Sequence, residues 1–356
     1  MPKNILVTGG AGFAGSHLCL ALRRAFADAH VTALDNLKRS GSELNLQRLR
    51  IAGVRFVHGD VRSQADLLAV APAPDLIIEC SAEPSAQAGY DGSPDYLVRT
   101  NLIGCYHCLE LTRTVKADFI FVSTSRVYPF GTLNSLACSE ADTRFVLESE
   151  QSVPGASVLG INERFPLDGP RSLYGMTKLN AELMVEEYSD AYGVRFIIDR
   201  FGLLTGPYQM AKSDQGVLAR WVAAHFYGRP LTYIGFGGCG KQVRDFLHVD
   251  DFCDLLIDQI RNFNLYQGQR FNAGGGVRHS LSLLEATGIC RDITGRTIDI
   301  ASSTQDRPAD VRIYLTDHRK LSAVNGWHPQ RDAITTLSDI HNWLIREGEQ
   351  YSSLLA

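Results

Sequence analysis

The chain has 356 residues, more than twice a typical domain of about 150, so we expect one large enzyme-sized unit or two packed domains. Hydrophobic residues make up 45% of the sequence and charged residues 21%, which allows a buried core and excludes disordered and fibrous classes. The formal net charge is −4, so no basic field exists to attract nucleic acid or anionic lipid. We therefore expect a globular protein that binds neither.

The sequence shows no targeting or metal-binding pattern. MPKNILVTGG has no apolar run of signal-peptide length, and nowhere do about 18 uncharged apolar residues follow one another, which predicts a cytoplasmic protein. Eight scattered cysteines are typical of reduced thiols in a cytosolic enzyme. Cys105 and Cys108 have C-x-x-C spacing, but no second pair follows to complete a zinc site. We predict that they are core-facing thiols on a helix and that no metal is bound.

Short apolar runs alternate with amphipathic segments in the first half of the chain. Five runs read as strands, at residues 4–9, 30–35, 54–60, 74–81 and 118–125. Segments such as SHLCLALRRAF and QADLLAVA between them have helical spacing. Strands that are apolar on both faces and separated by helices are typical of a parallel sheet covered on both sides. The pattern predicts a doubly wound α/β domain of the Rossmann type.

The second half begins with a polar stretch, 129–172, whose length without regular pattern is typical of a functional loop or a lid. Residues 172–193 then have helical spacing and end in glycine, and VRFIIDRF reads as a further strand. From about 203 the chain is more irregular, with glycine-rich turns around the apolar helix DFCDLLIDQI. This region predicts a smaller α+β lobe packed against the sheet.

The predicted boundaries follow from these patterns. The dinucleotide-binding domain is expected to comprise residues 1–200 plus about 243–270. The substrate lobe is expected to comprise about 201–242 plus 271–356.

The segment TGGAGFAG carries the strongest motif, with Gly9, Gly12 and Gly15 placed between the first strand and the first helix. Glycines there permit a tight turn, the approach of a pyrophosphate and close helix–strand packing, and the helix N-terminus supplies N–H donors. Asp35 closes the second strand twenty positions after Gly15, where a ribose-binding carboxylate is expected. The pattern predicts a dinucleotide site; the alternative is a turn that only joins strand to helix.

Charged residues around this site bear on which dinucleotide is bound. Asp35 would repel a 2′-phosphate, which favours NAD over NADP, although Lys38 and Arg39 weaken that preference. Asp60 ends the third strand and could accept a hydrogen bond from the adenine amino group. Its alternative role is to cap the helix that begins near Ser63.

Tyr174 and Lys178, in YGMTK, lie four residues apart and so on one face of a predicted helix. A phenol is a poor base at neutral pH, but a neighbouring ammonium and a nicotinamide cation both stabilise the phenolate. Thr124 and Ser125 end the apolar strand FIFVSTS, at the edge where open α/β sheets bind ligands. Beside a dinucleotide site, a Thr–Tyr–Lys set predicts hydride transfer with Tyr174 as the base.

Taken together, TGGAGFAG, Asp35, STSRVY and YGMTK resemble the extended short-chain dehydrogenases/reductases, the sugar-nucleotide epimerase and dehydratase group. The likeness continues through GKQVRDFLHVDD, FNAGGG and QDRPADVRIYLTDHRKL, and so runs nearly end to end. It implies a Rossmann fold, NAD as cofactor, a nucleotide-sugar substrate and a homodimer or homotetramer.

The resemblance also implies roles for individual residues. The cofactor contacts are expected from Gly9, Gly12, Phe13, Ala14, Gly15, Asp35, Asn36, Asp60, Val61, Ser81, Asn101, Tyr174 and Lys178. The substrate contacts are expected from Ser125, Arg126, Gln209, Gln215, Tyr233, Arg244 and Arg307. In the family, arginines that match Arg244 and Arg307 contact the diphosphate, and the segment containing Tyr233 lies along the base. Salt bridges are the alternative role of both arginines.

Two further sets of loop residues are expected to shape the sugar pocket. They are the 129–172 stretch, and Lys212 and Asp214 between the two glutamines named above.

Departures within the family narrow the reaction. Ser125 and Arg126 stand where 4,6-dehydratases carry Asp-Glu, so dehydration is not expected, and Ser125 also differs from the Glu of nucleotide-sugar decarboxylases. Segments such as DNLKRSGSELNLQRL, VRFVHGDVR and SDQGVLARWV resemble the CDP-tyvelose (CDP-paratose) 2-epimerase branch. That likeness implies inversion at carbon 2 of a CDP-dideoxyhexose. Glu79 replaces the histidine that many relatives have after the fourth strand, so a buried contact is altered.

The expected reaction is therefore a reversible epimerisation with no net redox change, in which Thr124, Tyr174 and Lys178 form the catalytic set. Two alternatives remain open. One is a nucleotide-sugar 4-epimerase or 4-ketoreductase with the same set. The other is a non-catalytic NAD-binding sensor, against which an intact catalytic set argues.

Overall fold

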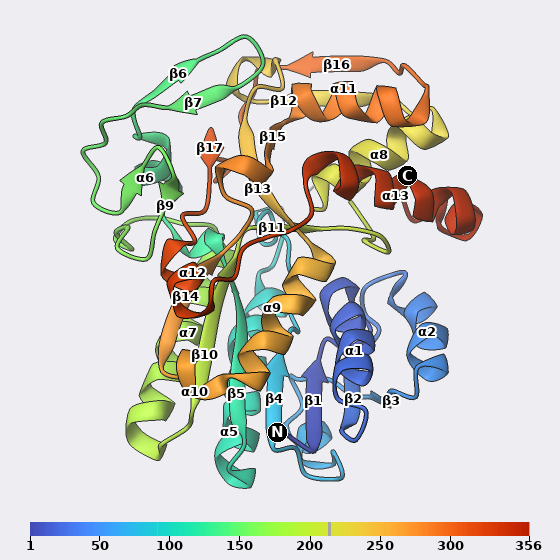
Figure 1. Ribbon diagram of the computed structural model, residues 1–356, viewed down its shortest axis with the longest axis vertical. Coiled ribbons are helices and arrows are strands. Elements are labelled where there is room, and N and C mark those ends of the chain that lie inside the picture. Colours follow the sequence, from blue (N-terminus) through green and yellow to red (C-terminus); the bar gives the residue numbers. More distant parts are fainter. Residues whose placement is uncertain (91, 213–214, 356) are drawn as a thin grey trace. The chain divides into compact units, whose positions relative to one another are not determined.

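The computed structural model of the chain describes residues 1–90, 92–212 and 215–355 (Figure 1). The chain forms two compact units. The first comprises Met1–Val127, Leu173–Arg200 and Phe252–Phe271. The second comprises Tyr128–Ser172, Phe201–Asp251 and Asn272–Ala356, and is about as large as the first. The sequence pattern predicts a smaller second lobe, and this prediction is wrong because the two units are of similar size.

A seven-stranded sheet organises the first unit, in the order β14-β10-β5-β4-β1-β2-β3. Its strands are β1 (Asn4–Thr8), β2 (His30–Asp35), β3 (Arg55–His58), β4 (Leu76–Glu79), β5 (Asp118–Thr124), β10 (Phe196–Phe201) and β14 (Gln269–Ala273). The neighbours from β3 to β5 pair in parallel. The chain runs from β1 to one side through β2 and β3, and to the other through β4 and β5. The strand order thus reverses between β1 and β4, where open sheets bind ligands at their carboxyl ends.

Helices cover both faces of this sheet, which confirms the doubly wound α/β prediction. They are α1 (Phe13–Ala25), α2 (Asn45–Ile51), α3 (Gln64–Leu68), α4 (Asp95–Val98), α5 (Gly104–Val115), α7 (Leu173–Tyr192), α9 (Val249–Arg261) and α10 (Phe263–Tyr266). In Figure 1, α1 and α9 lie in front of the sheet. A π-helical segment, Arg99–Ile103, joins α4 to α5. Short 3₁₀ turns occupy Ser42–Leu44 and Ser125–Val127.

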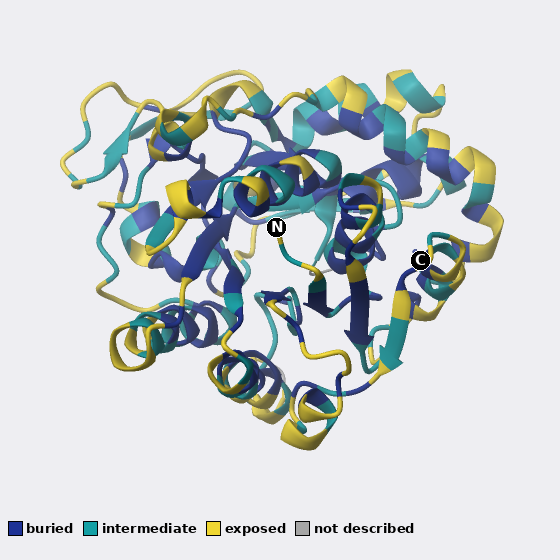
Figure 2. Cartoon of the chain, turned by 60° about the horizontal axis from the view of Figure 1, so that its bottom comes forward, coloured by how far each residue is buried: buried dark blue, intermediate teal, exposed yellow. Residues whose placement is uncertain are grey.

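The core of the first unit lies between the sheet and α3, α5 and α7. Leu6, Ile77 and Phe119 lie side by side on β1, β4 and β5 and belong to one cluster. Cys105 and Cys108 of α5 belong to the same cluster and are 0% exposed, which confirms the prediction that both thiols face the core. Consecutive residues of β1, β2, β4 and β10 are buried because both sheet faces are covered, and Figure 2 shows most of the strands in dark blue.

Mixed sheets and short helices make up the second unit, as expected for an α+β architecture. Its strands are β6 (Cys138–Glu140), β7 (Phe145–Leu147), β8 (Ala156–Ser157), β9 (Gly160–Ile161), β11 (Leu203–Thr205), β12 (Leu231–Ile234), β13 (Val243–His248), β15 (Ser280–Ser282), β16 (Ile300–Ser303) and β17 (Ile313–Tyr314). Its helices are α6 (Phe130–Asn134), α8 (Val217–Tyr227), α11 (Leu283–Thr294), α12 (Arg319–Asn325) and α13 (Ala333–Glu347). Its 3₁₀ turns among the described residues are Phe236–Gly238, Val277–His279 and Gly348–Tyr351.

Two segments predicted to belong to the dinucleotide domain lie in the second unit. Residues 243–251 do so because β13 pairs with β11, β15 and β17. Residues 128–172 do so because the pairs β6–β7 and β8–β9 form there, and Ile161 bridges to Thr316. The stretch 129–172 is therefore not without regular structure. Its hairpins were missed because each strand is only two or three residues long.

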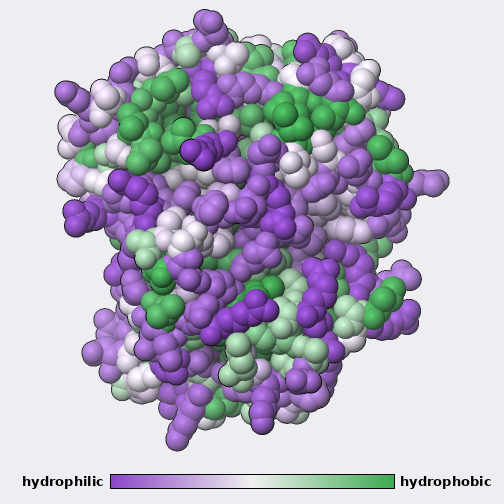
Figure 3. All heavy atoms as spheres, in the orientation of Figure 1, coloured by the Kyte–Doolittle hydropathy of each residue, from purple (hydrophilic) through white to green (hydrophobic). Residues whose placement is uncertain are grey.

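No helix among the described residues is long and apolar enough to cross a membrane. Figure 3 shows the face of Figure 1 with hydrophilic residues around several separate apolar groups. A surface of this kind is typical of a globular protein.

The first unit also buries an isolated carboxyl group. Asp199 of β10 is 0% exposed, and one of its oxygens accepts a hydrogen bond from Gln259 Nε2 of α9 at 2.8 Å. Its Oδ2 and the Gln259 Oε1 atom have no hydrogen-bond partner. A proton on Asp199 would let these two oxygens satisfy each other. Burial raises the pKa of Asp199 to about 7, although the Gln259 bond opposes this rise.

Because the pKa of Asp199 is higher in the folded chain than in the unfolded chain, protonation of Asp199 stabilises the folded state. The contribution is present below about pH 4 and is lost as pH rises to about 7. We therefore expect Asp199→Asn, whose amide matches Gln259 at every pH, to be more stable than the natural chain at pH 8, by a few kcal/mol at most. At pH 4 the two should unfold at similar denaturant concentrations. An equal difference at both pH values would show that Asp199 ionises normally.

Candidate functional site

The glycine-rich loop leads from β1 into α1 as the motif predicts. Gly9 has φ +64°, and a Cβ there would lie 2.8 Å from the Ser81 Cα atom. A Cβ on Gly15 would lie 2.2 Å from the carbonyl oxygen of Gly9, so both positions require glycine. Gly12 is the N-cap of α1 and provides no side-chain cap. The first turn, with Phe13 and Ala14 half-buried, therefore has N–H groups directed at the loop, as a pyrophosphate requires.

Asp35 holds this loop from the end of β2. Its two carboxylate oxygens accept hydrogen bonds from the Ala11 N–H at 3.1 Å and the Leu37 N–H at 2.8 Å. Burial raises the pKa of Asp35, and these backbone bonds partly offset the rise. A carboxylate has about four acceptor positions, so capacity remains for ribose hydroxyls. The residue thus fits both a loop-bracing and a ribose-binding role.

Asn36 and Asp60 meet on the neighbouring strand ends. Asn36 Nδ2 donates to Asp60 at 2.9 Å, and the Arg62 guanidinium forms an ion pair with Asp60 at 2.6 Å. Against the effect of burial, these hydrogen bonds lower the pKa of Asp60 to about 2. Arg62 lies over the ring of Tyr96, 4.8 Å from its centroid. The helix-capping alternative for Asp60 is wrong, because the Ser63 hydroxyl caps α3.

Three other residues that were expected to contact the cofactor make contacts within the protein instead. The Val61 side chain packs in the core, and its carbonyl accepts from His107. Asn101, in the π-helical segment, bonds to both backbone groups of Glu83 and to the Thr177 hydroxyl at 3.2 Å. Asn101 therefore ties the loop after β4 to α7, the helix that carries Tyr174 and Lys178. The Ser81 hydroxyl accepts from Thr8 at 3.2 Å and donates to a carboxylate at 2.6 Å, described next.

Lys178 and Glu79 form a buried ion pair beside Ser81. The Lys178 Nζ lies 3.6 Å from Glu79 Oε2, and the two side chains are 2% and 0% exposed. The same ammonium lies over the ring of Phe121, 4.2 Å from its centroid. Burial alone would lower the pKa of Lys178, but the charge of Glu79 raises it overall. Lys178 is therefore held as a cation in an apolar site.

Tyr174 and Thr124, the other two members of the predicted catalytic set, also lie in the first unit. Tyr174 lies in the first turn of α7 and is half-buried, one turn before Lys178. Thr124 ends β5 and is 8% exposed, and its Oγ1 accepts from the Arg126 N–H at 3.2 Å. Ser125 follows in a 3₁₀ turn. Thr124 thus lies at the carboxyl end of β5, and Tyr174 and Lys178 lie near the start of α7.

A second buried ion pair anchors the same helix. Glu182, one turn after Lys178, pairs with Arg200 at 2.6 Å, and both are 1% exposed. Glu182 also accepts from the Ser123 hydroxyl at 2.5 Å. The pair fixes α7 against β5 and β10, and so fixes where Tyr174 lies relative to Thr124.

In the second unit, two expected substrate residues are occupied by other contacts. Arg244 donates to Asp310 at 2.7 Å and to the Val311 carbonyl at 2.6 Å, which corresponds to the alternative salt-bridge role. The Tyr233 hydroxyl lies 2.7 Å from the Thr287 hydroxyl, and its ring stacks on Trp221 at 6.0 Å. A base contact from this segment would therefore come from its backbone.

Gln209 and Gln215 differ in whether their side-chain amides have hydrogen-bond partners. Gln209 accepts from Thr205 and donates to the Leu204 carbonyl, so its amide is satisfied internally. Gln215 keeps a buried Oε1 without a hydrogen-bond partner, and its backbone bridges to Lys212. Asp214 lies outside the described residues.

Sequence reasoning missed one cation near Arg307. Burial lowers the pKa of Arg220 on α8, and the charge of Arg307 lowers it further, so the two guanidinium groups act on each other. Among the described residues, no carboxylate forms an ion pair with Arg220. The signal was present in SDQGVLARWV, but an arginine within an apolar helix is usually taken to be a solvated side chain.

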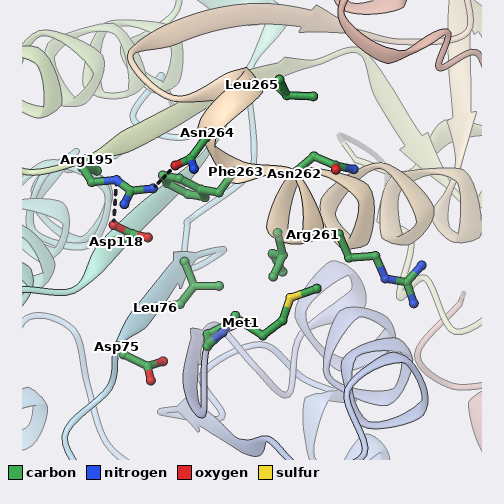
Figure 4. A pocket seen from close by; sticks show the side chains of 12 residues that line it. Met1, Asp75, Leu76, Asp118, Arg195, Arg261, Asn262, Phe263, Asn264 and Leu265 are labelled. Atoms are coloured by element: carbon green, nitrogen blue, oxygen red, sulfur yellow. Dashed lines mark hydrogen bonds and ion pairs between the residues drawn. The ribbon is translucent and has the colours of Figure 1, made fainter.

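A cavity of about 620 Å³ in the first unit lies away from these residues (Figure 4). Its lining includes Asp118, Arg195 and Phe263, from the amino ends of the strands and the segment after α9. Arg195 pairs with Asp118 at 3.4 Å and donates to Asn264 at 3.0 Å. The charge of Arg195 is thus balanced within the lining. The predicted catalytic residues Thr124, Tyr174 and Lys178 do not line this cavity.

Comparison with known proteins agrees with this geometry. Residues 5–274 match the NAD dependent epimerase/dehydratase family. A CDP-paratose 2-epimerase of Salmonella typhi is 29% identical over 95% of this chain and 98% of its own length. A dTDP-glucose 4,6-dehydratase of Mycolicibacterium smegmatis is also 29% identical, over 95% of this chain and 92% of its own.

Solved structures show the same fold. DesIV, a dTDP-glucose 4,6-dehydratase of Streptomyces venezuelae solved with NAD and TYD bound, is 25% identical and superimposes with a TM-score of 0.79, covering 99% of both chains. The family match over residues 5–274 spans more than half of the chain. It includes the glycine loop, Thr124 and the Tyr174–Lys178 pair. The chain belongs to the NAD dependent epimerase/dehydratase family.

Proposed function

We propose that the protein is an NAD-dependent epimerase that inverts carbon 2 of a CDP-linked dideoxyhexose. The observation that carries the proposal is the catalytic set at the carboxyl end of the sheet, followed by Ser125 rather than an acidic residue. A dehydratase must expel water from the sugar, which needs acid and base groups beside Thr124. Ser125 and Arg126 supply neither. The CDP-paratose 2-epimerase likeness over nearly the whole chain supports the choice of carbon and base.

The residues of the first unit fit NAD. Gly12 caps α1 without a side chain, which leaves backbone donors for a pyrophosphate, and Asp35 closes β2 with acceptor capacity for a ribose. A carboxylate there would repel a 2′-phosphate. When bound, NAD supplies a group that accepts a hydride from the sugar carbon and returns it.

The chain's own residues then handle the proton. Tyr174 takes the proton from the sugar hydroxyl as the keto sugar forms, and gives it back when the ring carbon is reduced on its other face. The Lys178 ammonium stabilises the phenolate. Thr124 Oγ1 shares a hydrogen bond with the reacting oxygen. Proton and hydride both return, so no net redox change occurs.

The second unit is proposed to hold the nucleotide diphosphate. Arg220 and Arg307 act on each other as two cations, and a diphosphate between guanidinium groups would relieve their repulsion. Arg244 would then act through its ion pair with Asp310 as a brace for the segment after Arg307. A homodimer or homotetramer, as the resemblance implies, stays a prediction.

Proton NMR of the purified protein with CDP-paratose and no added cofactor tests the proposal. We expect a second set of sugar signals, inverted at carbon 2, without added NAD. A product inverted at carbon 4 from another nucleotide sugar would identify a 4-epimerase, and consumption of added NAD(P)H would identify a reductase. Binding of NAD with no conversion of any nucleotide sugar would support a sensor.

A further inference from the structure

The buried pair of Glu79 and Lys178 has features that a structural salt bridge does not need. One Glu79 oxygen accepts the Ser81 hydroxyl at 2.6 Å, and Ser81 in turn accepts from Thr8. The other, Oε2, has no hydrogen-bond partner and faces the Lys178 ammonium at 3.6 Å. The first oxygen therefore fixes the carboxylate in place, and the second is directed at the lysine.

The surroundings leave this carboxylate as the counter-charge of the lysine. The groups that act on Lys178 are Glu79 and Cys80 from the end of β4, Cys105 from α5, and Tyr174 from its own helix. Burial raises the pKa of both thiols, so they are neutral. Phe121 of β5 contributes only a ring face. Burial raises the pKa of Glu79, and the charge of Lys178 and the Ser81 hydrogen bond partly offset this rise. Glu79 is the carboxylate that faces the ammonium, at 3.6 Å.

We propose that Glu79 is a positioning residue for the reaction: its carboxylate keeps the Lys178 ammonium charged and in place, and reduces the net positive charge that acts on Tyr174 and on the nicotinamide. The inference rests on the proposed roles of Tyr174 and Lys178. It adds a residue that touches neither the sugar nor the cofactor and acts through the lysine.

The sign of the effect follows from electrostatics. Removing a negative charge favours the deprotonated form of every neighbouring group, because each deprotonation then meets less repulsion. Without Glu79, the Tyr174 phenolate should form at lower pH, and Lys178 should lose its proton at lower pH than in the natural chain. Both limbs of the pH–rate profile should therefore move in the acid direction. A loss of packing alone would lower the rate without moving either limb.

Glu79→Gln and Glu79→Asp form a matched pair, since the first removes the charge at nearly constant shape and the second keeps the charge at altered geometry. The first readout needs no sugar. In NAD-loaded protein, the ultraviolet absorbance of the Tyr174 phenolate is taken as the difference from a Tyr174→Phe counterpart in the same background. We expect Glu79→Gln to increase the phenolate fraction about tenfold at pH values below the midpoint, and Glu79→Asp to resemble the natural chain.

A second readout is the rate at which borohydride reduces the bound NAD. The oxidised nicotinamide is a cation, so loss of a nearby carboxylate destabilises it relative to the reduced form. We expect faster reduction in Glu79→Gln than in Glu79→Asp. Equal phenolate midpoints and equal reduction rates in both variants would overturn the proposal, because Glu79 would then be a neutral acid in the natural chain.

Stability provides a test if Glu79→Gln folds poorly. Lys178→Met leaves an unpaired buried carboxylate, whereas Lys178→Met with Glu79→Gln leaves no charge. The double variant should therefore unfold at a higher denaturant concentration than Lys178→Met alone. The opposite order would contradict an ionised pair. A chain that passes these tests but does not invert CDP-paratose would retain the role of Glu79 and lose only the sugar assignment.

Discussion

Replacing Tyr174 by phenylalanine is expected to lower turnover by about a hundred- to ten-thousandfold, the range typical of a lost general base. In the proposed mechanism the hydroxyl takes the sugar proton, and the ring that remains keeps the packing of the first turn of α7. NAD should stay bound, because the glycine loop and Asp35 are unchanged. Turnover with nucleotide sugar and the NAD released on denaturation are the two quantities to measure.

Tyr192→Phe is the matched control for this experiment. Tyr192 ends the same helix, is 58% exposed, and contacts Tyr188 and Arg113 through its ring. The control should keep both turnover and bound NAD. Full turnover in Tyr174→Phe would remove the phenol from the mechanism, and loss of NAD together with turnover would indicate a role in binding instead.

Replacing Glu182 by glutamine should cost about 3–5 kcal/mol of unfolding free energy, because it removes the carboxylate that pairs with the buried Arg200 guanidinium. The Ser123 hydroxyl would also lose its charged acceptor. Urea unfolding followed by circular dichroism measures the change. The loss should be accompanied by lower turnover, since this pair fixes α7 near Thr124.

Asp95→Asn provides the comparison for that prediction. Asp95 pairs with Arg99 one turn along the chain, and both side chains are 64% exposed. Exposed pairs of this spacing contribute less than about 1 kcal/mol, so this variant should unfold almost as the natural chain does. A similar loss in both variants would mean that the Glu182–Arg200 pair is no more important than a surface contact.

Much of the first unit could be predicted because its signals are local. The strands are continuous apolar runs, as required when both sheet faces are covered. The glycine loop and the carboxylate that closes β2 lie at fixed offsets from those runs. Tyr174 and Lys178 share a helix face through their spacing alone. Fold class and family were therefore available from sequence, and the catalytic set stays a prediction.

Other features depend on contacts between residues far apart in the chain, and sequence spacing does not encode these. β13 belongs to the second unit because it pairs with β15 and β17. The sequence of β13 does not indicate which strands it pairs with. The hairpins within 129–172 are too short to produce a period.

Charge partners are likewise decided by the tertiary structure. Glu79 and Lys178 are ninety-nine positions apart, and only the meeting of β4 with α7 makes them an ion pair. Arg244 was expected at a diphosphate but meets Asp310 through the packing of the second unit. Asn101 and Ser81 were expected to contact the cofactor, and the structure gives both of them internal partners. The sequence by itself therefore determined which groups are present and on which elements they lie. The tertiary structure decided which buried charges face one another, because burial makes each such charge depend on the partner that the fold provides.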